Sequence, residues 1–222
     1  MKRMIRMKKK IKKSFWVAAC LLAAFILWTV AVRFVDVEAI GPEGSSVGFA
    51  KLNGFFHSLT GVNMTLYTVT DWLGLVPIAV CFGFAVLGLI QWIKRKNLLK
   101  VDRSILVLGG FYIAVMAVYI LFEYVVVNRR PVLIEGYLEA SYPSSTTLLV
   151  LCVMPTALMQ LNSRIKNNFF RYTVTTLIII FILFMVIGRL VSGVHWLTDI
   201  VGGALLSSGL VIMYYTFAHT KG

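Results

Sequence analysis

Residues 172–218 read YTVTTLIIIFILFMVIGRLVSGVHWLTDIVGGALLSSGLVIMYYTFA, and the junction GRLVSGVHWLTD at residues 188–199 separates two apolar runs. A helix needs about 20 mostly apolar residues to cross the hydrocarbon core of a bilayer, and both runs are of that length. The junction carries Arg189, His195 and Asp199, and charged residues at the edge of a spanning segment are costly and usually functional. The stretch therefore predicts two membrane helices that meet at a group of functional side chains.

The rest of the chain has the same apolar character. Its 222 residues are 59% hydrophobic and 14% charged, with a mean hydropathy of +0.85, whereas soluble domains have about 45–50% apolar and about 25% charged residues. The fourth apolar run is short, so we expect its helix to begin near Ser144 and to reach Leu161 or beyond. The fold class is predicted to be all-α, a six-helix transmembrane bundle, with its apolar runs at Phe15–Val35, Trp72–Ile93, Ile105–Val127, Thr146–Leu161, Tyr172–Val191 and Ile200–Ala218.

The basic residues are distributed unevenly between the two sides of this bundle. Eight precede residue 14, five lie at 94–103, three at 163–171 and one at Lys221, so 17 of the 22 face one side. The positive-inside rule places that side, with both termini, in the cytoplasm. The first run is longer than the apolar core of a signal peptide, so we expect it to be retained. The predicted organisation is a basic cytoplasmic tail (1–14) and one membrane domain (15–218) with an outside loop (36–71).

The net charge of +13 comes largely from the basic residues on the cytoplasmic side. We expect the basic tail to contact anionic lipids of the bilayer. No nucleic-acid partner is predicted. The three cysteines, Cys20, Cys81 and Cys152, lie inside apolar runs without a CxxC spacing. We therefore interpret them as buried small side chains and predict no disulfide framework, metal site or cofactor.

His195 and Asp199 are four residues apart, a spacing that places two side chains on one face of a helix. Asp199 can then accept a hydrogen bond from one imidazole nitrogen, which leaves the other nitrogen as a nucleophile or base. Ser192 and Gly193 permit a break, so Arg189 would approach His195 from the preceding helix. The simpler alternative for His195 and Asp199 is a structural hydrogen bond.

Two further outside segments can join this group. One is NRRP, in which Arg130 precedes Pro131, and the other is YPSSTT at 142–147, a pattern typical of a helix N-terminus. The fourth and sixth helices both begin on the outside, so their free N–H groups face the arginines. Helix N-termini and guanidinium groups together suit a phosphate. A plain helix cap, and a solvated or headgroup-contacting loop, are the alternatives for the two segments.

The order of these motifs resembles the type 2 phosphatidic acid phosphatase and vanadium haloperoxidase superfamily, specifically its bacterial membrane lipid phosphatase branch. That family has Lys-x6-Arg-Pro, Pro-Ser-Gly-His and Ser-Arg-x5-His-x3-Asp, and the resemblance covers residues 71–218. It implies that His195 attacks phosphorus to form a phospho-histidine and that Asp199 orients it. It further implies that the phosphate oxygens are held by Arg130, Arg189 and the backbone of Ser144 and Ser145. The resemblance implies no metal.

This chain departs from the family pattern within each of the three motifs. Glu123 stands where the family has the lysine, Gly188 where it has the serine, and Thr146 where it has the histidine that protonates the leaving oxygen. A general acid contributes about 10²–10⁴-fold to a rate, and its loss matters less for a pyrophosphate than for a monoester. The possible substitute acids are His57, Glu135 and Glu139. The other interpretation of His57 is an interfacial residue beside two phenylalanines.

Three functions follow. The first is a plasma-membrane phosphatase that hydrolyses a phospholipid phosphate or an isoprenyl phosphate or pyrophosphate at the extracytoplasmic face. The second is a catalytically impaired relative that binds anionic lipid headgroups without turnover. The third is a small transporter or scaffold, which no specific residue supports.

Overall fold

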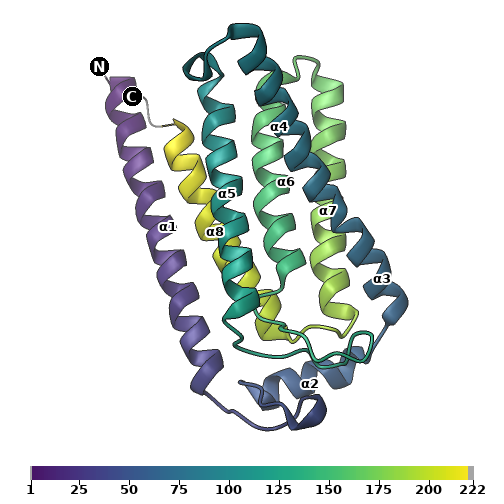
Figure 1. The fold of residues 1–222 in the computed structure, drawn as a ribbon. Coiled ribbons are helices and arrows are strands. Elements are labelled where there is room, and N and C mark those ends of the chain that lie inside the picture. The colour runs from purple at the N-terminus through teal and green to yellow at the C-terminus, as the bar shows by residue number, and fades with distance from the viewer. Residues whose placement is uncertain (1, 220–222) are drawn as a thin grey trace.

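The computed structural model describes residues 2–219, and every regular element in this part of the chain is a helix (Figure 1). The elements are α1 (Lys2–Phe34), η1 (Pro42–Gly44), α2 (Ala50–Thr60), α3 (Met64–Leu73), α4 (Leu75–Arg95), η2 (Leu98–Lys100), α5 (Arg103–Tyr124), α6 (Ser145–Arg164), α7 (Asn168–Val191) and α8 (Leu197–His219).

Six segments are long and apolar enough to span a membrane, which confirms the predicted all-α six-helix bundle. They are α1 from Lys9, α3 with α4, α5, α6, α7, and α8 as far as Ala218. The fourth span begins at Ser145 and ends at Arg164, as expected. The basic segment predicted as a tail forms the first turns of α1 from Lys2 onward, while Lys221 lies outside the described residues.

The second span differs from the prediction. It begins at Met64 rather than at Trp72, because α3 continues at Gly74 directly into α4. Asp71 interrupts the hydropathy pattern there, yet the helix tolerates it because the carboxylate pairs with Arg189 at 3.1 Å. The expected outside loop at 36–71 therefore contains η1, α2 and most of α3.

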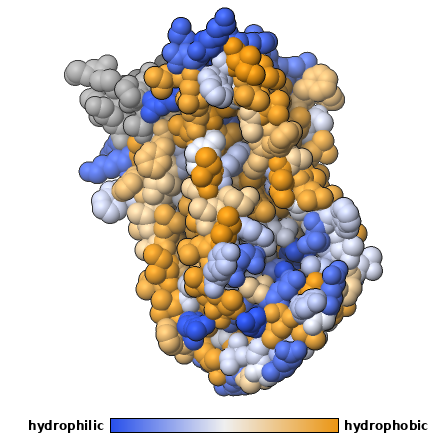
Figure 2. Space-filling view, in the orientation of Figure 1, coloured by the Kyte–Doolittle hydropathy of each residue, from blue (hydrophilic) through white to orange (hydrophobic). Residues whose placement is uncertain are grey.

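α6 lies at the centre of the bundle. In the most apolar 18-residue segment of α6, 56% of the residues are buried, whereas the corresponding shares are 17% in α1 and 22% in α7. It packs against α7 and α8, and α1 runs along the outside of α8. Apolar side chains cover the length of the bundle and hydrophilic ones gather toward its two ends, the pattern that a bilayer requires (Figure 2).

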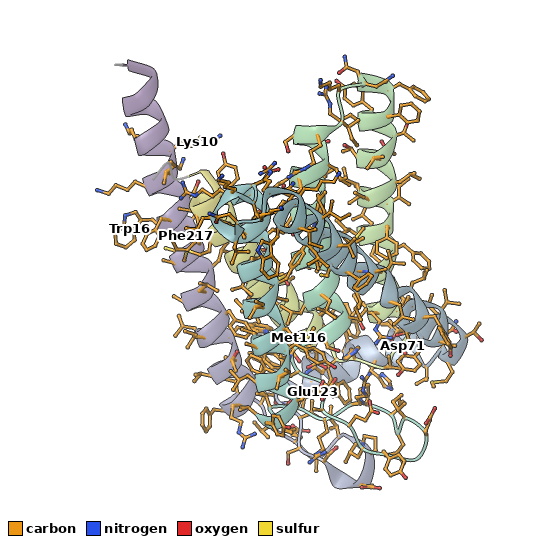
Figure 3. All side chains as sticks on the ribbon, turned by 45° about the horizontal axis from the view of Figure 1, so that its top comes forward. Lys10, Trp16, Asp71, Met116, Glu123 and Phe217 are labelled. Atoms are coloured by element: carbon orange, nitrogen blue, oxygen red, sulfur yellow. The ribbon has the colours of Figure 1, made fainter. Side chains whose placement is uncertain are left out.

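One end of the bundle holds the start of α1 and the end of α8, and α2 lies across the opposite end (Figure 1). Asn53 on α2 connects it to α8, because its side chain donates to Thr198 Oγ1 at 3.0 Å and accepts from Thr198 N at 3.2 Å. Figure 3 shows Asp71 and Glu123 toward the α2 end, away from Lys10 and Phe217. We call this the site end, since it carries the residues described next.

Candidate active site

His195 lies in the turn between α7 and α8, and its side chain is almost completely buried. Gly193 allows this turn, because its φ is +67° and a Cβ there would lie 1.8 Å from the carbonyl oxygen of Gly61. The backbone N–H of Asn63, which precedes α3, donates to the carbonyl of Ser192 at 3.0 Å and connects the turn to the start of α3. The prediction that His195 shares a helix face with Asp199 is wrong, because α8 begins only at Leu197.

Ser141 connects His195 to Asp199. Its Oγ lies 3.0 Å from His195 Nδ1 and donates a short hydrogen bond to Asp199 Oδ2. The direct distance from Nδ1 to Oδ2 is 3.7 Å, too long for the hydrogen bond predicted from the spacing. Asp199 Oδ2 also accepts from the backbone N–H of Trp196 at 2.9 Å, which fixes the carboxylate at the start of α8.

Arg130 determines which imidazole nitrogen carries the lone pair and which carries the proton. Its Nη1 lies 3.3 Å from His195 Nε2, and a guanidinium can only donate, so Nε2 accepts. Nδ1 then carries the proton and donates it to Ser141, whose own hydroxyl donates to Asp199. Burial first, and then the charges of Arg130 and Arg189, hold the pKa of His195 well below its ordinary value. The imidazole is therefore neutral at pH 7, with its lone pair on Nε2.

The loop between α5 and α6 brings Arg130 and Ser141 together. Its two arms pair at their base, where Arg130 N donates to the carbonyl of Glu139 at 3.1 Å and Ser141 N to that of Asn128 at 3.0 Å. The indole N–H of Trp196 donates to the carbonyl of Arg129 at 2.8 Å and ties the loop to the start of α8. Residues far apart in sequence thus contact one imidazole.

The two arginines are buried beneath exposed carboxylates. Arg130 Nε lies 2.9 Å from Glu139 Oε2, and Arg189 Nη2 lies 3.1 Å from Asp71 Oδ1. The Tyr67 ring lies 4.8 Å from the guanidinium carbon of Arg189 and 5.9 Å from that of Arg130, which adds a cation–π contact to each. Both guanidinium groups are positioned without a ligand and are neutralised by carboxylates that face outward.

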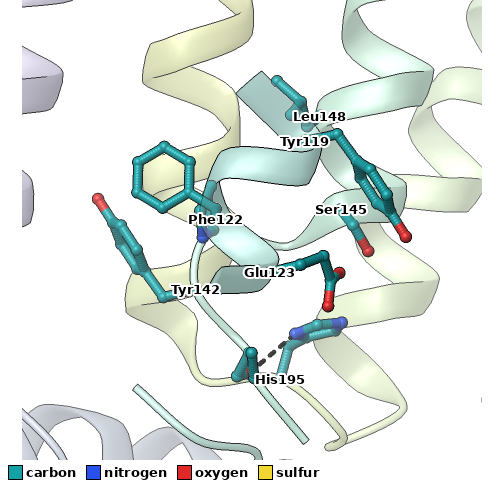
Figure 4. Close-up of a pocket in the computed structure, with 10 residues that line it drawn as sticks. Tyr119, Phe122, Glu123, Tyr142, Ser145, Leu148 and His195 are labelled. Atoms are coloured by element: carbon teal, nitrogen blue, oxygen red, sulfur yellow. Dashed lines mark hydrogen bonds between the residues drawn. The ribbon is translucent and has the colours of Figure 1, made fainter. Parts of the chain in front are cut away.

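A polar cleft of about 720 Å³ lies over these arginines. The first residues of α6, Ser145 and Thr146, line it together with Tyr67, Tyr119, Glu123 and Glu139. A second cavity of only about 10 Å³ lies beside His195 and shares Tyr119, Glu123 and Ser145 with the cleft (Figure 4). The cleft can hold a phosphate-sized anion over Arg130, whose guanidinium group contacts the imidazole.

Ser144 does not act as predicted. Its backbone N–H donates to the carbonyl of Asp199 at 3.1 Å, so it is not free for a phosphate. Its side chain caps α6, since Ser144 Oγ accepts from the backbone N–H of Thr147 at 3.5 Å, and it also accepts from the Thr147 hydroxyl at 3.0 Å. Ser145, by contrast, lines both cavities at the helix N-terminus, where the predicted role remains available to it.

The predicted substitute acids separate into three locations. His57 packs on the Trp196 ring, with ring centroids 5.4 Å apart, and burial lowers its pKa. Glu135 is exposed at the tip of the hairpin formed by the bridge between Ile134 and Tyr137. Only Glu139 lines the cleft, where it pairs with Arg130.

The sequence interpretation missed Ser141, Tyr67, Asp71 and Tyr119. Ser141 gave one signal, its position directly before YPSS. The others lie on helical segments that carry no motif. Gly188, the departure from the family serine, has a structural cause, because a Cβ there would lie 2.8 Å from Thr70 Cγ2 where α3 packs on α7.

Comparison with known proteins points to the family that the motifs resemble. Residues 123–222 match the PAP2 superfamily, a range that begins at Glu123 and includes all three motifs. The fold is similar to the crystal structure of the first transmembrane PAP2 type phosphatidylglycerolphosphate phosphatase from Bacillus subtilis. The TM-score is 0.52 at 18% sequence identity, and the likeness covers 90% of this chain and 94% of that chain. No curated protein matches.

The fold is that of a multi-pass membrane protein, and its candidate site combines a buried imidazole with two buried arginines. Together these two matches support assignment of the chain to the PAP2 superfamily. The family assignment indicates a membrane phosphatase in general terms.

Proposed function

We propose that this protein hydrolyses a lipid phosphate or pyrophosphate through a phospho-histidine intermediate at the extracytoplasmic face of the plasma membrane. One observation carries the proposal. The Nε2 lone pair of a buried, neutral His195 faces Arg130 at 3.3 Å, while Ser141 and Asp199 continue from the opposite nitrogen. This is the arrangement of an activated nucleophile whose orientation is set by a third group.

The arginines support binding of the phosphate. An incoming phosphate would replace Glu139 and Asp71 as the partner of Arg130 and Arg189, and the N-terminal amides of α6 would donate to it. His195 Nε2 then attacks phosphorus and the bond to the leaving oxygen breaks. The positive charge that develops on the imidazole is stabilised through Nδ1–H, Ser141 and the Asp199 carboxylate.

An apolar groove supports a lipid rather than a soluble phosphate as the substrate. Ile78 lines the polar cleft and also the end of a groove of about 720 Å³ between α4 and α5. Side chains such as Phe82, Leu89 and Ile113 line this groove, which faces the bilayer along two spanning helices. A headgroup in the cleft can therefore leave its hydrocarbon chain in apolar surroundings.

The basic residues support the assignment of sides. The site end carries few of them, and the positive-inside rule then directs it away from the cytoplasm. A cysteine introduced at Glu135, which is exposed at the hairpin tip, tests this. In intact cells we expect a membrane-impermeant thiol reagent to label that cysteine, and labelling only after lysis would reverse the orientation.

Phosphate release by the purified protein tests the activity. We expect release from at least one of phosphatidic acid, phosphatidylglycerol phosphate and an isoprenyl pyrophosphate, and no release by His195→Ala. Glu135→Gln is the matched control and should retain wild-type rates. Activity that survives in His195→Ala would exclude the phospho-histidine mechanism.

Thr146 favours a second candidate, a relative that binds anionic headgroups without turnover. It lines the cleft at the family position of the leaving-group acid, and a threonine hydroxyl does not donate its proton near neutral pH. Saturable binding of phosphatidic acid without any phosphate release would establish this candidate instead.

A further inference from the structure

Two of the departures from the family pattern lie in one place. Glu123 and Thr146 are 23 positions apart in sequence, yet both line the cleft above the arginines. Glu123 also lines the small cavity beside His195, and in Figure 4 its carboxyl group points toward the imidazole. The residue that replaces the family lysine therefore faces the same cleft as the residue that replaces the family histidine.

The charges in the cleft distinguish Glu123 from the other acids. Glu139 pairs with Arg130 and Asp71 pairs with Arg189. Among the described residues Glu123 forms no ion pair, and the side chain that interacts with it is Tyr119, one helical turn earlier. A carboxylate without a cation beside a bound phosphate experiences like-charge repulsion, which a shared proton relieves.

We propose that Glu123 is the acid–base residue of this active site and performs the proton transfers for which the family uses the histidine at position 146. The inference rests on the proposed phosphatase function. It explains why the two departures occur together, since a lysine at 123 would add a cation where this chain needs a proton carrier. A positioned carboxyl group is a common general acid and base.

The proton balance closes over one cycle. In the first step Nε2 of His195 forms a bond to phosphorus, the bond to the leaving oxygen breaks, and the Glu123 carboxyl proton passes to that oxygen. In the second step the Glu123 carboxylate takes a proton from water, the water oxygen attacks phosphorus, and the nitrogen–phosphorus bond breaks. Inorganic phosphate leaves, and Glu123 and His195 return to their starting states.

The test compares Glu123→Gln with the wild-type protein on two substrates. The variant keeps the shape of the side chain but loses its transferable proton. With phosphatidic acid, whose leaving group is a poor one, we expect kcat to fall by about 10²–10⁴-fold. With p-nitrophenyl phosphate the first step needs no acid, so we expect a burst of about one p-nitrophenolate per enzyme. Slow turnover and an acid-labile phospho-histidine should follow, because the second step lacks its base.

Two further variants and the wild-type protein complete the experiment. Glu123→Asp keeps the carboxyl group and should recover part of the rate on phosphatidic acid, and Glu135→Gln should behave as wild type. Equal losses on both substrates without a burst, or unchanged hydrolysis of phosphatidic acid by Glu123→Gln, would overturn this inference alone, provided His195→Ala remains inactive. A wild-type protein that releases no phosphate from any lipid would overturn the proposed function and this inference with it.

Discussion

The two ends of the bundle hold their charges in opposite ways. At the end that carries the start of α1, Arg95 lies 2.9 Å from Asp102, and the two side chains are 42% and 41% exposed. At the site end the side chains of Arg130 and Arg189 are only 9% and 1% exposed, while the carboxylates that pair with them are 44% and 55% exposed. The first pair lies in water, whereas the second arrangement places cations inside and anions outside.

This difference separates a surface ion pair from a binding site. An exposed pair is screened by water and stabilises a protein by about 0–1 kcal/mol. A buried guanidinium needs an anionic partner at all times, because an unpaired charge inside a protein is strongly destabilising. The exposed carboxylates supply that partner, and under the proposed function a phosphate would replace them without exposing the arginines.

Replacing the buried cation should have the largest effect. Arg189→Lys keeps the charge but loses the planar fork that can bind Asp71 or a phosphate at two points. A hydrogen bond to a charged group contributes about 1.5–3 kcal/mol, so we expect kcat/KM for phosphate release to fall about 10- to 100-fold. Arg95→Lys at the opposite end is the matched control and should leave kcat/KM unchanged. Similar losses in both variants would remove the distinction between the two ends.

Replacing Ser141 should have a smaller effect on the rate of phosphate release. Ser141→Ala removes the hydroxyl that accepts from His195 Nδ1 and donates to Asp199, while the 3.7 Å between those two groups is too long for a direct bond. The neutral nucleophile stays in place but its developing charge is less well stabilised. We expect kcat to fall about tenfold, the equivalent of one neutral hydrogen bond, with little change in KM. A change in KM alone would place Ser141 in substrate binding instead.

Acid stability should show the smallest difference between the ends. The pKa of His195 is held well below its ordinary value, so the folded protein binds fewer protons than the unfolded chain below about pH 6.5, and its stability falls as the pH falls. The pKa of Asp102 is lowered chiefly by its hydrogen bond to Arg95, so its contribution is lost only at more acid pH, below about 3.8.

The interval from pH 7.5 to 5.5 therefore reports on the site end. We expect the thermal midpoint in detergent to fall over this interval, and to fall less in His195→Asn, which removes the titrating imidazole. His57 shifts in the same direction and should account for part of the remainder. An identical fall in both proteins would show that His195 does not contribute to acid sensitivity.

The sequence predicted the spans well, because hydropathy and helix length are local properties of a segment. It placed five of the six runs close to the observed helices and failed at Asp71, where a charge is tolerated through a partner 118 positions away. The motif residues Arg130, Arg189 and His195 lie at one end of the bundle, since the alternation of spans puts their junctions there. Arg130 contacts His195, whereas Arg189 contacts Asp71 and the Tyr67 ring that it shares with Arg130.

The contacts between these residues depended on tertiary structure. Three contacts follow from the course of the loop between α5 and α6. Ser141 lies between His195 and Asp199, the Ser144 amide donates to the backbone carbonyl of Asp199, and Glu139 pairs with Arg130. Spacing along a chain cannot give distances across a loop. The sequence alone therefore determined a membrane bundle that carries the motifs of a phosphate-binding site at one end. Only the packing of that loop against α8 decided which atoms meet, and the packing of α5 against α6 and α8 placed Glu123 at the small cavity that His195 lines.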